Sequence, residues 1–115
     1  AYTAEAGLTG MRTILAGPPV TAVVAANDLL SLGIYDALTE AGLRPGTDVS
    51  VTGFNDMPFV DRINPSLTTV RIQHAEMGRR GATLLLEELT SHTRERRDLR
   101  LRPRLIVRES TQQRR

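Results

Sequence analysis

The most constraining feature of the sequence is the stretch VVAANDLLSLGIYDAL at residues 23–38. An apolar run ends abruptly at Asn27 and Asp28, and apolar residues then recur at helical spacing. Runs that are rich in valine and lack polar alternation are typical of parallel strands buried on both faces. The pattern therefore predicts a buried strand over 20–26, then a helix with Asp28 as its N-cap that runs to about Ala41.

Strand and helix patterns alternate along the rest of the chain, and Gly42 is predicted to cap the helix in a left-handed conformation. Gly78 and Gly81 each cost about 1 kcal/mol relative to alanine inside a helix, so they predict close approach of a neighbouring backbone. The other expected elements are a helix around 8–15, a strand over 49–54, an extended segment over 67–72, a helix over 75–89 and a strand over 104–110. A strand–helix–strand unit predicts parallel strands with a right-handed crossover. The expected fold class is α/β, a Rossmann-like parallel sheet with flanking helices.

Polar side chains follow two of the expected parallel strands. Asn27 comes just after the first strand, and Asn55 comes just after the second, in VTGFND. The carboxyl ends of parallel strands form one rim, where ligands bind. Each amide both donates and accepts hydrogen bonds, which suits a hydroxyl-rich or amide-bearing ligand. The alternative is that the asparagines only make turns; Asp28 and Asp56 are expected to cap or orient the backbone.

Several functional classes have no support in the sequence. With 40% apolar and 24% charged residues the chain is typical of soluble proteins, and no apolar run approaches the roughly 18 residues of a membrane span. There is no cysteine, no serine lies in a nucleophile elbow, and the turn AANDLL is not a glycine-rich phosphate loop. His74 and His92 lack metal-ligand spacing with carboxylates. We therefore expect no enzyme activity, no cofactor and no metal site.

Charge is unevenly distributed along the chain. Nine of the 15 arginines lie in residues 94–115, which carry a net charge of +6, whereas residues 1–93 carry −4. Such a tail either contacts phosphate or serves as a solvated connector, and general charge patterning favours the connector.

Five motifs occur in order: AAND, GLRPGTDVSVTGFND, LTTV, EMG and VREST. Together they closely resemble the C-terminal part of the effector domain of the lactose/galactose-repressor family of bacterial transcription regulators, over nearly the whole chain. The resemblance implies an incomplete C-terminal lobe of a type I periplasmic-binding-protein-like fold. It assigns 1–71 to that lobe, 72–93 to the crossing segment and a helix of the N-terminal lobe, and 94–115 to a connector and closing strand with the basic tail.

The same resemblance implies a function. A small-molecule effector, a sugar or a related polar metabolite, binds between two lobes of a cytoplasmic regulator. Its binding controls attachment to operator DNA through an N-terminal helix-turn-helix that is missing from this sequence. The alternative is a periplasmic sugar-binding protein of the same fold, which a signal peptide in the parent gene would favour.

Four residues match effector positions of the family. Asn27 matches a residue that often touches the effector. Asn55 matches a position that is an aspartate in many members, and this departure removes a charge-assisted bond, which leaves the effector class open. Ile72 and His74 match the strand that lines the cleft. The favoured alternative for His74 is a histidine that begins the next helix or lies at the surface.

The helix from Leu29 to Ala41 carries more apolar residues than one core face needs. A helix that is apolar nearly all round is usually buried on two sides. The residues that suffice for the core are Leu30, Ile34, Ala37 and Ala41, which leaves Leu29, Leu32 and Tyr35. Because the family dimerises through this lobe, these three are predicted at a homodimer interface; a deep core helix is the alternative.

Overall fold

The computed structural model describes residues 1–91 and 96–113 and falls into two compact units. The first unit is formed by Ala1–Arg71 with Leu105–Arg115, and the second by Ile72–Arg104. The division after residue 71 coincides with an expected boundary, whereas the closing strand belongs to the first unit. The assignment of these parts to two lobes stays a prediction, and His92 lies outside the described residues.

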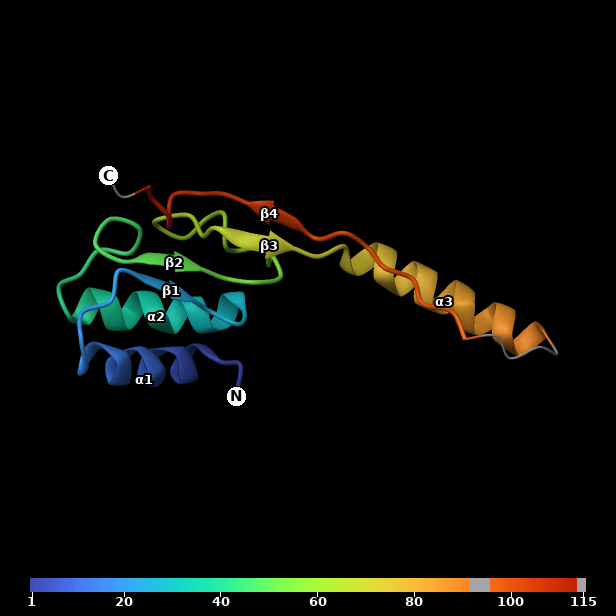
Figure 1. Cartoon of the computed structure of the whole chain (residues 1–115), viewed down its shortest axis with the longest axis horizontal. Helices are drawn as coiled ribbons and strands as arrows, with labels where there is room; N and C mark the ends of the chain where they lie inside the picture. Colours follow the sequence, from blue (N-terminus) through green and yellow to red (C-terminus); the bar gives the residue numbers. More distant parts are fainter. Residues whose placement is uncertain (92–95, 114–115) are drawn as a thin grey trace. The chain divides into compact units, whose positions relative to one another are not determined.

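The first unit contains two helices and two two-stranded sheets, one of which is formed by parallel strands. Its elements are α1 (Ala4–Leu15), β1 (Ala22–Val24), α2 (Asp28–Glu40), β2 (Ser50–Thr52), β3 (Thr69–Arg71) and β4 (Arg104–Ile106). β1 and β2 are parallel, with Val23 opposite Val51, and α2 lies between these strands and α1 (Figure 1). The predicted α/β class with a parallel sheet is therefore confirmed. Gly42 follows α2 with φ +71°, as predicted for its cap.

The chain after β4 completes the sheet by inserting between β2 and the segment before β3. Ser110 is fully buried there: its hydroxyl donates to the Val51 carbonyl at 2.6 Å and accepts from the Thr68 amide at 2.8 Å. Just past β2 the chain bonds directly to the segment before β3: the Gly53 amide donates to the Thr68 carbonyl at 2.9 Å, and Thr52 and Thr68 form an isolated parallel bridge. β4 in turn pairs with β3.

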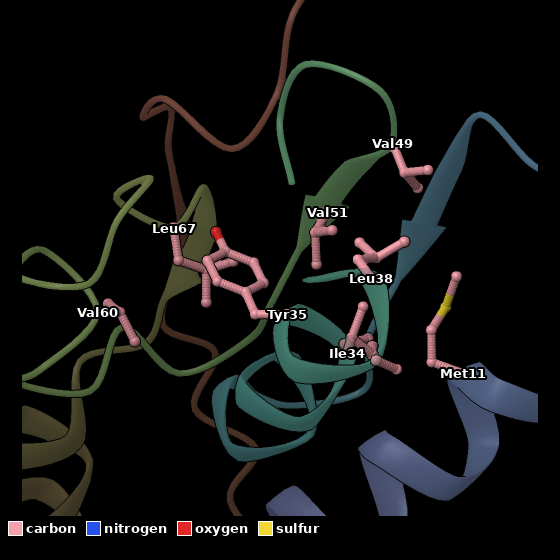
Figure 2. Packing of buried hydrophobic residues seen from close by; sticks show 10 residues of the cluster. Met11, Ile34, Tyr35, Leu38, Val49, Val51, Val60 and Leu67 are labelled. Carbon is pink, nitrogen blue, oxygen red and sulfur yellow. The ribbon is translucent and has the colours of Figure 1, made fainter. Parts of the chain in front are cut away.

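One apolar core lies between the sheet and α2, with the loop before β3 closing its side (Figure 2). Leu38 and Val51 are fully buried at its centre. Tyr35 points toward Val60 and Leu67, and its hydroxyl donates to the Pro65 carbonyl at 3.0 Å. Burial raises the pKa of Tyr35 to about 12. Tyr35 is thus a core residue of its own chain.

Two expectations about the first strand and helix are wrong. β1 is not buried on both faces, because Val23 packs against the core while Val24, on the opposite face, is 84% exposed. Apolar content predicts burial but not which elements cover each face. The N-cap of α2 is Asn27 rather than Asp28: Asn27 has extended backbone, and its side-chain oxygen accepts from the Leu30 amide at 2.9 Å.

Close backbone approach occurs between α1 and α2 rather than at the predicted glycines. A Cβ at Gly33 would lie 1.7 Å from the Ala4 carbonyl oxygen, and one at Gly7 would lie 2.1 Å from the Leu30 oxygen. A Cβ at Gly78 or Gly81 would meet no atom within 4 Å. The prediction of close approach at Gly78 and Gly81 is therefore wrong, and the close approach is found at Gly7 and Gly33 instead.

The second unit contains α3 (His74–Thr90), which carries no buried residue. Its exposed apolar side chains are Met77, Leu85, Leu86 and Leu89. Arg79 and Arg80 both form ion pairs with Glu76 on the same helix. Across the residues that the structure describes, no helix combines the length and apolar character needed to cross a membrane.

Candidate functional site

The ends of three strands form one rim in the first unit. The Ala25 amide donates to the Thr52 carbonyl at 2.9 Å, and the Asp28 amide to the Phe54 carbonyl at 3.1 Å. On the other side, the Asn55 amide donates to the Val70 carbonyl at 2.9 Å. The backbones of 25–28 and 52–55 therefore run side by side past the regular strands. This brings Asn27 and Asn55 to the same edge of the sheet, as their spacing predicts.

The two asparagines are held differently. The side-chain oxygen of Asn27 caps α2, so an Asn27 amide that also bound a ligand would do so through its nitrogen. Asn55 has φ +116° and Asp56 has φ +58°. Two successive non-glycine residues in this region carry strain of about 1–3 kcal/mol each, and such conformations persist only where surrounding contacts enforce them.

Asp28 is the first of those contacts. Its side chain is fully buried; one carboxylate oxygen accepts from the Met57 amide at 2.8 Å and the other from the Thr69 hydroxyl at 2.7 Å. Gly53 leaves room for it, because a Cβ there would lie 2.3 Å from the Asp28 oxygen. Asp28 therefore ties the start of α2 to the end of the loop that carries Asn55 and to the first residue of β3. Orientation of the backbone is the role expected for it.

The side chain of Asp56 makes the second set of contacts that hold the loop at residues 55 and 56. Only 6% of its side chain is exposed, and it forms ion pairs with Arg108 at 2.7 Å and with Arg71. Burial raises the pKa of Asp56, but hydrogen bonds from Arg108 and Arg71 outweigh it and leave that pKa below its ordinary value. A carboxylate with a lowered folded-state pKa stabilises the fold above its unfolded pKa. That stabilisation is lost as the pH falls through the folded pKa.

Ile72 and His74 belong to the second unit. Ile72 is half-buried, whereas His74 is exposed and is the first residue of α3. The helix-start role of His74 is therefore present, and its contact with an effector stays a prediction.

A hollow of about 330 Å³ lies elsewhere in the second unit, and none of the four predicted effector residues lines it. Its arginines have acidic partners, since Arg79 and Arg80 pair with Glu76 and Arg97 pairs with Glu87. No cluster of three or more potential metal ligands occurs within residues 1–91 and 96–113.

The three predicted interface residues differ in exposure. Leu29 is 39% exposed and Leu32 is half-buried, so both offer surface to a partner. Tyr35 offers little, because it is buried against its own chain. From the sequence, Tyr35 could lie on the core face of α2 or on its outer face. The loop before β3 packs over Tyr35 and makes it part of the core.

Comparison with known proteins decides the family. Residues 1–111 match the model of the periplasmic binding protein-like domain. The chain belongs to the periplasmic binding protein-like domain family. It is 38% identical over 110 residues to the HTH-type transcriptional regulator MalR of Streptomyces coelicolor, which covers 96% of this chain and 32% of MalR. It is 34% identical over 111 residues to the HTH-type transcriptional repressor PurR of Pasteurella multocida, which covers 96% of this chain and 33% of PurR. The chain thus spans about a third of the length of these relatives.

Solved structures of transcription regulators resemble this chain in fold as well as in sequence. The complex of the transcriptional regulator CelR with cellobiose has a TM-score of 0.89 and 38% identity, over 94% of this chain and 33% of that one. A LacI-family regulator of Enterococcus faecium with bound ribose has a TM-score of 0.86 and 32% identity, over 95% of this chain and 40% of that one. These findings confirm the resemblance to effector domains of lactose-repressor-type regulators. They do not favour the periplasmic sugar-binding alternative, and the relatives are regulators rather than enzymes.

The sequence did not reveal the two carboxylates that hold the rim in place. Asp28 is expected to cap or orient the backbone, but the sequence does not name its partners Met57 and Thr69, which lie 29 and 41 residues away. Asp56 and Arg108 are 52 residues apart. An acidic residue directly after each rim asparagine is the one local signal, and it does not name the partners.

Proposed function

We propose that this chain is part of the effector-sensing and dimerising domain of a cytoplasmic transcription regulator. A sugar or related polar metabolite binds at the rim through Asn27 and Asn55, with Ile72 and His74 as further contacts. The observation that carries the proposal is the backbone hydrogen bond from Asp28 to Phe54, which brings the two asparagines to one edge. The regulators solved with ribose and with cellobiose support a sugar-like ligand. Operator DNA is bound by a separate helix-turn-helix.

Asn55→Gly tests the ligand contact at the second strand. Glycine removes the amide yet accepts the positive φ of this position, so the loss is confined to the side chain. Effector binding is expected to weaken by about 1–3 kcal/mol, because polar groups of the ligand lose their partner. Isothermal calorimetry on the intact regulator, with the sugar that most raises its melting temperature, measures the change.

Asn27 needs a variant that keeps the helix cap. Asn27→Ser retains an oxygen that caps α2 but removes the amide nitrogen, so binding is expected to weaken while stability is nearly kept. Asn27→Ala serves as the comparison, since it loses the cap as well. Unchanged calorimetric affinity in both Asn27→Ser and Asn55→Gly would remove the asparagines from the site.

The dimer surface is tested by Leu32→Glu. Leu29 and Leu32 on α2 are proposed to meet a second copy of the chain. The lac repressor, 32% identical to this chain, has been solved as a dimer bound to operator, which supports a dimer. A buried, unpaired carboxylate strongly disfavours association, so the variant is expected to sediment as a monomer. Tyr35→Phe is the control: it loses a bond to Pro65 inside its own chain and should stay dimeric. A dimeric Leu32→Glu protein in analytical ultracentrifugation would rule this surface out.

A further inference from the structure

One carboxylate ties the loop that carries Asn55 to two segments, the strand by which the chain leaves the first unit and the segment that follows its return. Asp56 accepts from Arg71, the last residue of the unit before Ile72, and from Arg108, shortly after the chain returns at Leu105. Each oxygen of the carboxylate takes one arginine. Asp56 is therefore the point where the rim meets β3 and the chain after β4.

Arg108, which follows β4, is itself firmly placed. Its second guanidinium nitrogen donates to the Leu67 carbonyl at 2.8 Å, and its backbone amide donates to the Thr68 hydroxyl at 2.8 Å. Its side chain is 16% exposed, so Arg108 has little freedom to follow a moving partner. Arg71 is more open, at 49% exposed. One ion pair thus fixes Asp56, and the other adds a weaker, solvent-accessible hold.

We call Asp56 with its partners Arg71 and Arg108 the clamp, and the clamp acts on a loop with unusual backbone angles. Asn55 and Asp56 both have positive φ, a region that non-glycine residues seldom adopt, although Asn and Asp enter it more readily than most. The carboxylate of Asp56 and the amide of Asn55, bonded to Val70, hold the pair from two sides. Released from the clamp, residues 55 and 56 would return to ordinary backbone angles, and the direction of the Asn55 amide would change with them.

We propose that Asp56 is a positioning residue of the effector site, which acts through Asn55 and is held by Arg108 and Arg71. This inference rests on the proposed function, because Asn55 must touch the effector for its orientation to matter. Asp56 itself is occupied by two arginines and does not contact the ligand. Its role is to keep a strained loop in the one conformation that presents the amide at the rim.

The decisive experiment is a double-mutant cycle on the intact regulator, titrated with ribose and with cellobiose. Asp56→Asn keeps the shape of the side chain and removes its charge, and it is expected to weaken binding about tenfold. In the Asn55→Gly background the same change should alter binding less than about twofold, because the residue through which it acts is gone. Equal losses in the two backgrounds would show that Asp56 acts on the fold in general and would overturn the proposal. If the Asn55→Gly single variant binds as tightly as the parent, the proposed effector contact of Asn55 fails instead.

Two further variants serve as controls. Arg71→Gln removes the exposed ion pair to Asp56 and leaves the buried pair with Arg108 in place. It should weaken effector binding less than Asp56→Asn does, and this loss of affinity should disappear in the Asn55→Gly background. Glu40→Gln is the matched control, since it breaks a two-pronged pair with Arg12 between α1 and α2 and should leave affinity unchanged.

A second measurement needs no ligand. The Asn55 amide hydrogen is bonded to Val70, so hydrogen exchange reports how firmly the loop is held. Asp56→Asn should speed exchange at this amide by about tenfold or more, with little change at Val51 in the core. Unaltered exchange at Asn55 would overturn the positioning role even if neither sugar binds.

Discussion

Gly33→Ala is expected to destabilise the first unit by about 3 kcal/mol or more, an effect at the upper end of those seen on overpacking. The added methyl would lie 1.7 Å from the Ala4 carbonyl oxygen and 2.4 Å from the Leu8 nitrogen, and both are backbone atoms of α1. Backbone atoms cannot rotate aside as a side chain does, so α1 must move away from α2. Urea denaturation followed by circular dichroism measures the loss as a lower midpoint.

Gly10→Ala is the matched control for this experiment. Gly10 lies on α1 only three residues beyond Gly7, yet a Cβ there meets no atom within 4 Å. Alanine should therefore stabilise the helix by about 1 kcal/mol through its higher propensity. A second variant, Gly7→Ala, approaches the same contact from the other helix and should behave like Gly33→Ala. Equal stability of the Gly33 and Gly10 variants would contradict the close backbone contact.

The alternation of strands and helices was predictable because it is written in local patterns. The apolar run before Asn27, the helical spacing after it and Gly42 at its end depend on neighbours along the chain, and the structure contains each element. The expected helix over 75–89 is α3, one residue longer at each end. The expected strands are longer than the observed ones, because the chain stays extended past the regular strands and keeps single hydrogen bonds there, as at Ala25, Gly53 and Asn55.

Burial was harder to predict, since it depends on what packs against each face. Val24 has the same apolar character as Val23, but only Val23 faces the core. Tyr35 was expected at a surface, and the loop containing Val60 and Leu67 covers it. Helical periodicity gives the direction of a side chain, whereas the element that lies in that direction comes from elsewhere in the chain.

The sequence predicts which backbone segments form the rim, but it does not predict the side-chain interactions that hold the rim in place. Strand order alone places Asn27 and Asn55 at one edge. The partners of Asp28 and Asp56 lie up to 52 residues away, and no periodic pattern links residues at such separations. Their interactions are nonetheless the ones that fix the conformation of the rim.

Asp28→Ala is expected to have the second large effect, a destabilisation of about 3 kcal/mol. The substitution leaves the Met57 amide and the Thr69 hydroxyl without their buried acceptor, and an unsatisfied buried donor costs about 1–3 kcal/mol.

Thr69→Val, which removes one donor at constant shape, should cost less than Asp28→Ala. In a double-mutant cycle by urea denaturation the two losses should not add, because both variants break the same hydrogen bond. Because the Met57 amide directly follows the Asn55–Asp56 pair and donates to Asp28, Asp28→Ala should also speed hydrogen exchange at this amide more than at core amides of α2. An Asp28→Ala protein within about 0.5 kcal/mol of the parent, the range of ordinary surface changes, would mean that this carboxylate does not hold the rim.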